Sequence, residues 1–162
     1  MLTRERLKEL MYYDPETGVF TWKCSPSKKI RIGAVAGCVL PTGYMVIGID
    51  REVFLSHRLA WLYVHSEFPS ETLQIDHRDG VRSNNKLGNL RCVTPKVNKQ
   101  NQRNARVDSS SGIIGIRPCG SRWEARIVIC GKRHYLGLFD TQEEAHSAYL
   151  NAKRKYHEGC TI

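Results

Sequence analysis

The sequence predicts an α+β protein made of two small domains, and two stretches carry this prediction. In residues 73–101, a short apolar strand, a loop rich in glycine and asparagine, a second strand and a helix follow one another. In residues 113–157, three segments of alternating apolar and polar residues precede one amphipathic helix. The second pattern predicts a three-stranded antiparallel sheet that is covered on one face by a helix.

The positive charge is spread along the whole chain. The 162 residues are 41% hydrophobic and 25% charged, which is typical of a globular protein, and their net charge is +9. Each of the segments 1–66, 67–104 and 105–162 contributes +3 to this total. An even distribution predicts an extended basic face for a polyanionic partner rather than one basic tail.

The cysteines and the hydropathy exclude several classes of protein. No two cysteines have the C-x₂-C spacing of a zinc knuckle, so we expect reduced and mostly buried thiols. The six positions are Cys24, Cys38, Cys92, Cys119, Cys130 and Cys160. There is no signal-peptide pattern and no apolar run near 18 residues, so we expect no membrane span and a cytosolic protein.

The residues before 73–101, the central stretch of the chain, predict a mixed lead-in of helices and short strands. We expect helices over 3–11 and 57–64, a strand over 19–22, and a hairpin formed by 43–49 and 53–55. His57, at the start of the second helix, is either a ligand or a structural histidine of the core.

The central stretch places an acid and a histidine at the end of a strand. Residues 73–77 predict that strand, 78–89 an irregular loop and 90–93 a returning strand. Thr94 then caps a helix with Pro95 at its first position, and this helix carries Asn98. A strand packed against this helix can bring the acid and Asn98 to one ion.

The residue types in this stretch indicate metal-assisted attack on a phosphodiester. Asp76 and Asn98 offer hard oxygen ligands of the kind that Mg²⁺ prefers. His77 can take a proton from water near neutral pH. The lysines and arginines around them suit a polyanionic substrate.

A polar segment separates this stretch from the rest of the chain. Residues 102–112 show no hydrophobic period. We therefore predict a first domain over 1–104, a linker at 105–112 and a second domain over 113–162.

The second domain shows a complete sheet-and-helix pattern. Strands are expected over 113–117, 123–129 and 133–138, with Leu136 and Leu138 facing inward. Thr141 and Glu144 form a capping box for the helix. Its predicted buried stripe consists of Ala145, Ala148, Tyr149, Ala152 and Tyr156.

The uncovered face of this sheet carries cationic and aromatic side chains. They are Arg117, Arg126, Arg133 and Tyr135. Arginines on such a face can pair with guanine in the DNA major groove.

The stretch 57–102 resembles the HNH endonucleases of the phage and homing type. The matching residues are His57-Arg58-Leu59, Asp76-His77-Arg78-Asp79-Gly80, Asn84-Asn85, Asn89-Leu90-Arg91 and Asn98, with a similar lead-in at 13–22. The resemblance implies a ββα-metal nuclease fold, double-stranded DNA as the substrate, and Mg²⁺ or Mn²⁺ as the cofactor. It implies that His77 is the general base, that Asp76 and Asn98 bind the metal, and that Asn89 holds the loop. The products would carry 5′-phosphate and 3′-hydroxyl ends.

Residues 112–157 resemble the plant-type ethylene-response-factor (APETALA-type) DNA-binding domain. The matching residues are Gly115-Ile116-Arg117, Trp123-Glu124-Ala125, the run from Arg133 to Thr141, Glu143-Glu144-Ala145 and Ala148-Tyr149. The resemblance implies DNA contacts by Arg117, Arg133 and Tyr135, to which we add Arg122 and, as a replacement contact, Arg126. Ile114 and Val128 stand in place of arginines and Cys119 in place of a tryptophan, so the plant target sequence does not carry over.

Two functions follow from these patterns. The first is a site-selective DNA endonuclease that nicks one strand or cuts both. The second is a non-catalytic, repressor-like DNA-binding protein on a nuclease scaffold, against which the intact set Asp76, His77, Asn89 and Asn98 argues. We expect a monomer, with a dimer as the alternative, in the cytoplasm of a bacterial host if the protein is phage-encoded.

Overall fold

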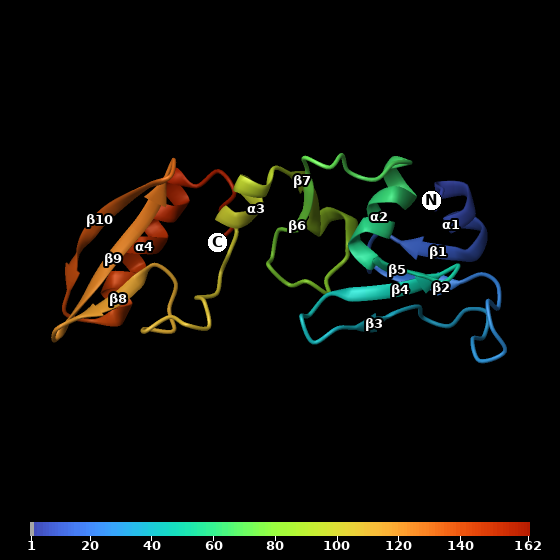
Figure 1. The fold of residues 1–162 in the computed structure, drawn as a ribbon, viewed down its shortest axis with the longest axis horizontal. Coiled ribbons are helices and arrows are strands. Elements are labelled where there is room, and N and C mark those ends of the chain that lie inside the picture. Colours follow the sequence, from blue (N-terminus) through green and yellow to red (C-terminus); the bar gives the residue numbers. More distant parts are fainter. Residues whose placement is uncertain (1) are drawn as a thin grey trace. The chain divides into compact units, whose positions relative to one another are not determined.

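A computed structural model describes residues 2–162, which form two compact units that divide between Pro95 and Lys96. The first unit contains α1 (Arg4–Leu10), β1 (Met11–Asp14), β2 (Val19–Trp22), β3 (Cys38–Val39), β4 (Met45–Ile49), β5 (Glu52–Leu55), α2 (Ser56–His65), β6 (Gln74–His77), the 3₁₀ turn η1 (Leu87–Asn89) and β7 (Leu90–Val93). The second contains α3 (Pro95–Gln100, of which Pro95 belongs to the first unit), β8 (Ile116–Cys119), β9 (Arg122–Ile129), β10 (Lys132–Phe139) and α4 (Gln142–Tyr156) (Figure 1). This confirms the α+β class. The domain bounds 1–104, 105–112 and 113–162 stay a prediction.

The first helix is shorter than predicted because a strand begins at Met11. Thr3 caps α1, with its Oγ1 accepting a hydrogen bond from the Arg6 amide at 3.2 Å. Met11 then starts β1, which pairs antiparallel with β2 from Met11↔Trp22 to Asp14↔Val19. The sequence analysis missed β1, because its apolar residues also fit the end of a helix.

The core of the first unit lies between this hairpin, the β3–β4–β5 sheet and α2. The predicted hairpin is confirmed as β4 and β5, and Asp50 and Arg51 turn between them with positive φ values of 48° and 70°. Helix α2 packs against these two strands. The largest fully buried apolar side chains are Tyr13, Phe20, Leu7, Met11, Ile47 and Leu59.

The strand–loop–strand pattern of the central stretch is confirmed. Strands β6 and β7 pair antiparallel from Gln74↔Val93 to His77↔Leu90. The loop between them contains only η1 as regular structure. The helix predicted after Thr94 is confirmed as α3.

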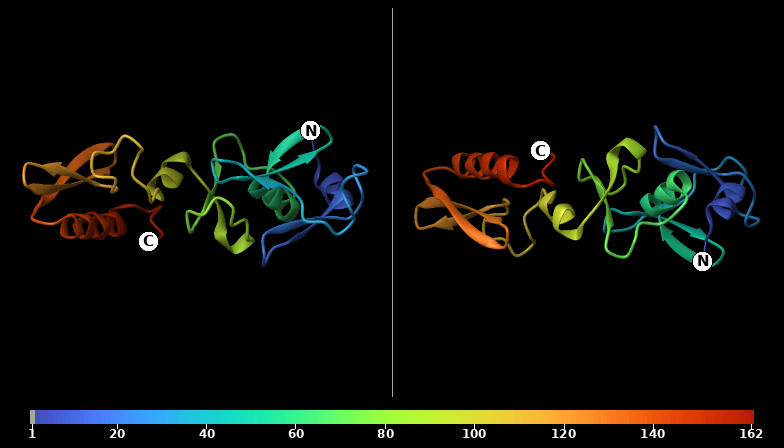
Figure 2. Two further views of the ribbon diagram at one scale, coloured as in Figure 1. Left: turned by 90° about the horizontal axis from the view of Figure 1, so that it is seen from below. Right: turned by 90° about the horizontal axis from the view of Figure 1, so that it is seen from above.

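The second unit is a three-stranded antiparallel sheet, in the order β10–β9–β8, with α4 along one face (Figure 2). Thr141 caps α4 as predicted, since its side chain accepts from the Glu144 amide. The apolar residues of α4 pack on Ala125 and Ile127 of β9. No helix of residues 2–162 is both long and apolar enough to cross a membrane.

Two predicted inward positions of this unit are wrong. A β-bulge between Tyr135 and Gly137 shifts the register of β10, so Leu138 pairs with Glu124 on the outer face. Phe139 takes the inner place and packs with the core. Tyr156, at the last turn of α4, is 47% exposed.

Candidate active site

The end of β6 buries a carboxylate and an imidazole side by side. Asp76 is 6% exposed and His77 is 5% exposed. Arg91, the cross-strand partner of Asp76 on β7, places its Nη2 2.8 Å and its Nε 2.9 Å from Asp76 Oδ2. A buried charge is costly unless it is paired. The pairing of β6 with β7 therefore supplies the cation that makes a buried aspartate tolerable.

Asparagine side chains close the loop that follows His77. Asn89 Nδ2 donates to Asp79 Oδ1 at 2.9 Å and to the Asn84 carbonyl at 2.8 Å, and Asn89 Oδ1 accepts from the Asp79 amide at 3.0 Å. Asn84 Nδ2 donates to Asp79 Oδ2 at 2.6 Å. Burial acts to raise the pKa of Asp79, but the hydrogen bonds from Asn84, Val81 and Asn89 lower it on balance. The loop is thus organised around one carboxylate.

A buried amide selects the tautomer of His77. Asn85 is 1% exposed, and its Oδ1 lies 3.1 Å from His77 Nε2. Its Nδ2 donates to the Ser83 carbonyl at 3.3 Å, which orients the amide so that its oxygen faces the imidazole. An amide oxygen only accepts, so His77 Nε2 carries the proton and the lone pair of the neutral ring is on Nδ1. Asn85 had no assigned role in the sequence, and its only signal was its place in the Asn84-Asn85 pair.

The environment of His77 favours the neutral ring that a general base requires. Burial lowers the pKa of His77 below its ordinary value, although the hydrogen bond to Asn85 and the charges of Asp79 and Asp76 act in the opposite direction. The ring is therefore unprotonated at neutral pH and able to accept a proton.

The turn between β1 and β2 supports this loop from behind. Tyr13 Oη donates to the Asn85 carbonyl at 2.7 Å, and the Leu87 amide donates to the Pro15 carbonyl at 3.0 Å. Gly18 has a φ of +75°, and a Cβ there would lie 2.4 Å from the Lys86 nitrogen. Only glycine allows such a close approach. The lead-in at residues 13–22 therefore shapes the loop that contains Asn85, the partner of His77.

A second buried histidine lies against His77. The rings of His57 and His77 meet edge to face, with centroids 5.1 Å apart, and Tyr44 contacts both. Burial, followed by the charges of His77 and Arg58, lowers the pKa of His57 to about 3. His57 is thus a neutral ring that packs against His77. The guanidinium of Arg82 lies 4.9 Å from the centroid of Tyr44 and borders this cluster.

Comparisons with known proteins match this motif. A family profile described as HNH endonuclease matches residues 54–100. DNA endonuclease I-HmuI of Bacillus phage SP01 is 31% identical over 136 residues, which cover 74% of this chain and 75% of that protein. The chain belongs to the HNH endonuclease family. YosQ, an SPbeta prophage-derived protein of Bacillus subtilis (strain 168), is 31% identical over 102 residues, or 60% of this chain and 55% of YosQ.

One solved structure also matches this HNH endonuclease. It is described as DNA binding and cleavage by the HNH homing endonuclease I-HmuI, at 30% identity and a TM-score of 0.44. The match covers 57% of this chain and about half, 51%, of the solved one.

The donor chemistry of the HNH motif fits a hard divalent ion. Asp76 provides a carboxylate, and Asn98, on α3 of the second unit, provides an amide oxygen. Within residues 2–162 no group of three or more His, Cys, Asp or Glu side chains could hold a metal ion. Mg²⁺ is commonly held by one or two carboxylates together with substrate phosphates and water.

The outer face of the second unit gathers arginines around one buried acid. Glu124 is 4% exposed and forms ion pairs with Arg117, at 2.8 Å, and with Arg126. Arg122 pairs with Asp140 at 2.8 Å, while Arg133 and Tyr135 are exposed on β10. The burial of Glu124 was not predicted from the sequence, and the two arginines that pair with it explain it.

A groove runs along this arginine face of the HNH protein. Its volume is about 650 Å³. Residues of the segment 102–116 line it together with Arg117, Arg126 and Arg133. The predicted DNA-contacting arginines Arg117, Arg126 and Arg133 therefore border one concave surface within the second unit, whereas Arg122 lies at a different, shallower pocket with Asp140.

Proposed function

We propose that the protein is a divalent-metal-dependent DNA endonuclease of the homing type, which leaves 5′-phosphate and 3′-hydroxyl ends. The buried, neutral His77 beside Asp76, with its tautomer set by Asn85, is the observation that carries the proposal. DNA as the substrate is supported by the naming of I-HmuI as a DNA endonuclease. The net charge of +9 is consistent with a polyanionic substrate.

His77 is the proposed general base. Its Nδ1 takes a proton from the attacking water while Nε2–H stays bound to Asn85, so the imidazolium that forms is stabilised by the same amide. Asn89 acts indirectly, because its three hydrogen bonds hold the loop that follows His77. Positioned proton transfer of this kind contributes about 10²- to 10⁴-fold to a rate.

Asp76 and Asn98 are the proposed ligands of Mg²⁺ or Mn²⁺. The assignment of Asn98 rests on its place in the HNH motif, and that of Asp76 also on its position next to the base. A bound divalent ion supplies Lewis acidity at the phosphate and stabilises the charge on the leaving oxygen. Arg91 holds the carboxylate of Asp76 in one orientation from the neighbouring strand.

Double-stranded DNA is the proposed partner of the arginine face. Arg117, Arg126 and Arg133 are proposed to contact DNA from the groove, with Tyr135 and Arg122 beside them. The ion pairs of Arg117 and Arg126 with Glu124 set the direction of both guanidinium groups before DNA arrives. A single HNH site per monomer favours a nick in one strand, and a double-strand break would need a dimer or a second event.

Nicking of supercoiled plasmid tests this function. The full chain is incubated with plasmid and Mg²⁺ or Mn²⁺, and in parallel with EDTA. We expect nicked circles with either metal and none with EDTA, and the ends should be substrates for ligase without prior phosphorylation. Plasmid that stays supercoiled with every divalent ion, while gel shifts persist, would leave only the DNA-binding alternative.

A further inference from the structure

We propose that residues 159–162, which follow α4, form a latch that holds helix α3 in position. The inference rests on the proposed function for its catalytic meaning, because α3 carries the proposed ligand Asn98. The latch contacts all lie within the second unit. Their consequence is that the end of the second unit steadies the helix that carries the proposed ligand Asn98.

Helix α3 has little to hold it by itself. It has six residues, none of them buried, and its sequence contains one apolar side chain, Val97. A helix of this length is unstable in isolation, because too few hydrogen bonds repay its nucleation. Its order must therefore come from contacts outside the helix.

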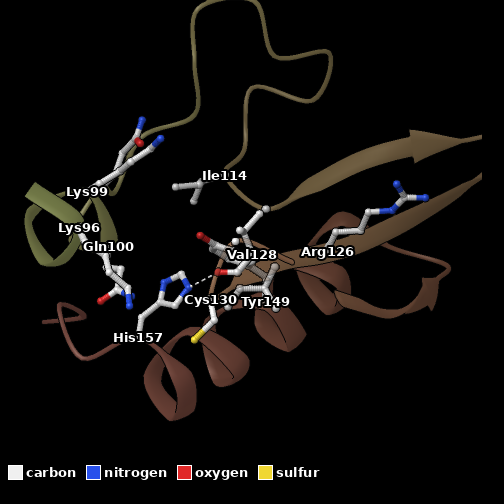
Figure 3. A pocket seen from close by; sticks show the side chains of 13 residues that line it. Lys96, Lys99, Gln100, Ile114, Arg126, Val128, Cys130, Tyr149 and His157 are labelled. Carbon is white, nitrogen blue, oxygen red and sulfur yellow. Dashed lines mark hydrogen bonds between the residues drawn. The ribbon is translucent and has the colours of Figure 1, made fainter. Parts of the chain in front are cut away.

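The sheet itself stands apart from α3. A cavity of about 350 Å³ separates them, with Lys96, Lys99 and Gln100 at one side and Val128 and Arg126 of β9 at the other (Figure 3). His157, just after α4, closes the lower end through a 2.8 Å contact between its Nε2 and the Val128 carbonyl. Contacts from α4 and from the residues after it reach α3 and the segment that follows it.

Gly159 of the latch packs directly against the backbone of α3. Gly159 is buried, and its amide donates to Gln100 Oε1 at 3.0 Å. A Cβ on Gly159 would lie 2.1 Å from the Val97 carbonyl oxygen and 2.8 Å from Gln100 Cβ. Any larger residue would have to displace a turn of α3.

One hydroxyl in the latch joins two residues that follow α3. Thr161 Oγ1 donates to Asn101 Oδ1 at 2.6 Å and accepts from Arg103 Nη2 at 2.8 Å. Asn101 is 4% exposed, so its amide could not turn to water if this bond were lost. The hydroxyl is therefore the centre of a small buried network.

A buried lysine of α4 completes the attachment. Lys153 is 1% exposed, and its ammonium donates to the Gln102 carbonyl at 2.5 Å. Lys153 lies in the last turn of α4, where a cation interacts favourably with the helix dipole without being buried. Burial against the residues after α3 gives it a second role, that of binding the Gln102 carbonyl in the segment that follows the helix.

Hydrogen exchange in the full chain tests the latch directly, without DNA and in EDTA. The variants are Thr161→Val, which keeps the shape and removes the hydroxyl, Gly159→Ala, and Lys153→Met. Thr161→Ser restores the hydroxyl, and Lys155→Met is the exposed control on the same helix. We expect amides 97–102 to exchange about fivefold to tenfold faster in the three latch variants, as for loss of one net hydrogen bond. Thr161→Ser and Lys155→Met should match the wild type.

Amides of β9 and β10 serve as the internal reference. If they accelerate together with α3, the contacts serve only the fold of the second unit, and the proposal is overturned. Unchanged exchange of 97–102 in Thr161→Val and Lys153→Met overturns it as well.

Metal binding tests the link from the latch to the active site. Binding of Mn²⁺ to the same proteins, measured by the fraction of free ion, should weaken severalfold in Thr161→Val and recover in Thr161→Ser. Asn98→Ala provides the reference for loss of the proposed ligand. If Asn98→Ala binds Mn²⁺ like the wild type, the ligand assignment fails, while the exchange result still decides whether the latch exists. If Asn98→Ala weakens binding and Thr161→Val does not, the link from the latch to the metal is overturned.

Discussion

The loop of the active site and the arginine face of the sheet are built in opposite ways. Around His77, the contacts are buried or partly buried hydrogen bonds made by the neutral amides of Asn85 and Asn89. On the sheet, the contacts are ion pairs whose arginines remain about half exposed, at 55% for Arg117 and 41% for Arg126. A network of amides fixes one geometry, whereas a half-exposed guanidinium keeps donors open to solvent while it stays paired with the buried Glu124. The first suits the positioning of one side chain, and the second suits a surface that is proposed to contact phosphates or bases.

Removal of the base gives the largest effect expected from this contrast. His77→Ala should lower the plasmid nicking rate by about 10²- to 10⁴-fold, because it removes the proposed general base. Affinity for DNA, measured by gel shift in EDTA, should stay within about twofold, since His77 contributes no charge to the binding surface at neutral pH. Nicking that persists in His77→Ala would assign the base to another residue.

Loss of the Asn85 amide, which binds His77, should have the next largest effect on nicking. Asn85→Leu removes the acceptor of His77 Nε2–H and leaves the backbone contact with Tyr13 in place. We expect the maximal nicking rate to fall about tenfold to hundredfold, as for other supporting partners of catalytic groups. The half-saturating DNA concentration should not change. Asn151→Leu, at an exposed position of α4, is the control. An equal loss of nicking rate in both variants would show a general effect on folding.

Substitutions on the arginine face should alter DNA affinity rather than the maximal nicking rate. Arg133→Gln should reduce the slope of log affinity against log salt by about one, as expected for a single lost phosphate contact. The maximal nicking rate should be unaltered. Lys155→Gln, on the helix that covers the other face of the sheet, should keep the wild-type slope. A wild-type slope in Arg133→Gln would remove this residue from the DNA contacts.

The smallest effect concerns stability rather than turnover. The folded protein keeps the pKa of His57 at about 3, whereas the unfolded chain has the ordinary value of 6.5. Between these values the unfolded chain binds one more proton, so stability rises with pH and is lost as pH falls. Between pH 6 and pH 4, burial of His57 should lower the free energy of unfolding of the wild type by about 1.4 kcal/mol per pH unit. In His57→Gln this contribution should be missing. Urea unfolding of both proteins at several pH values measures this difference. If the free energy of unfolding changes with pH equally in both, the burial argument is contradicted.

Local patterns were sufficient to predict much of the chain. The capping box at Thr141 and Glu144 defined α4, and the run of glycine and asparagine between two apolar segments defined the loop after His77. These features depend on neighbours in sequence. The pairing of Asp76 with Arg91 was not foreseen, although antiparallel strands joined by a loop allow it.

The unpredicted parts depend on contacts between distant residues. Which asparagine reaches His77 is decided by the path of the loop, and that path is set by Tyr13 and Gly18 some seventy residues earlier in the chain. A bulge that alternation cannot reveal moved Leu138 to the outer face. The latch on α3 was equally invisible, because Gly159 and Thr161 follow the last regular element and have no periodic pattern.

The division between chemistry and binding is tested most directly by the rate of nicking as a function of plasmid concentration. The measurement compares the wild type with the combined variant Arg117→Gln, Arg126→Gln and Arg133→Gln. The account predicts a half-saturating DNA concentration raised on the order of tenfold or more and a maximal rate within about twofold of the wild type. A maximal rate that collapses while the half-saturating concentration stays unchanged would contradict it, and would place the arginine face in the chemical step.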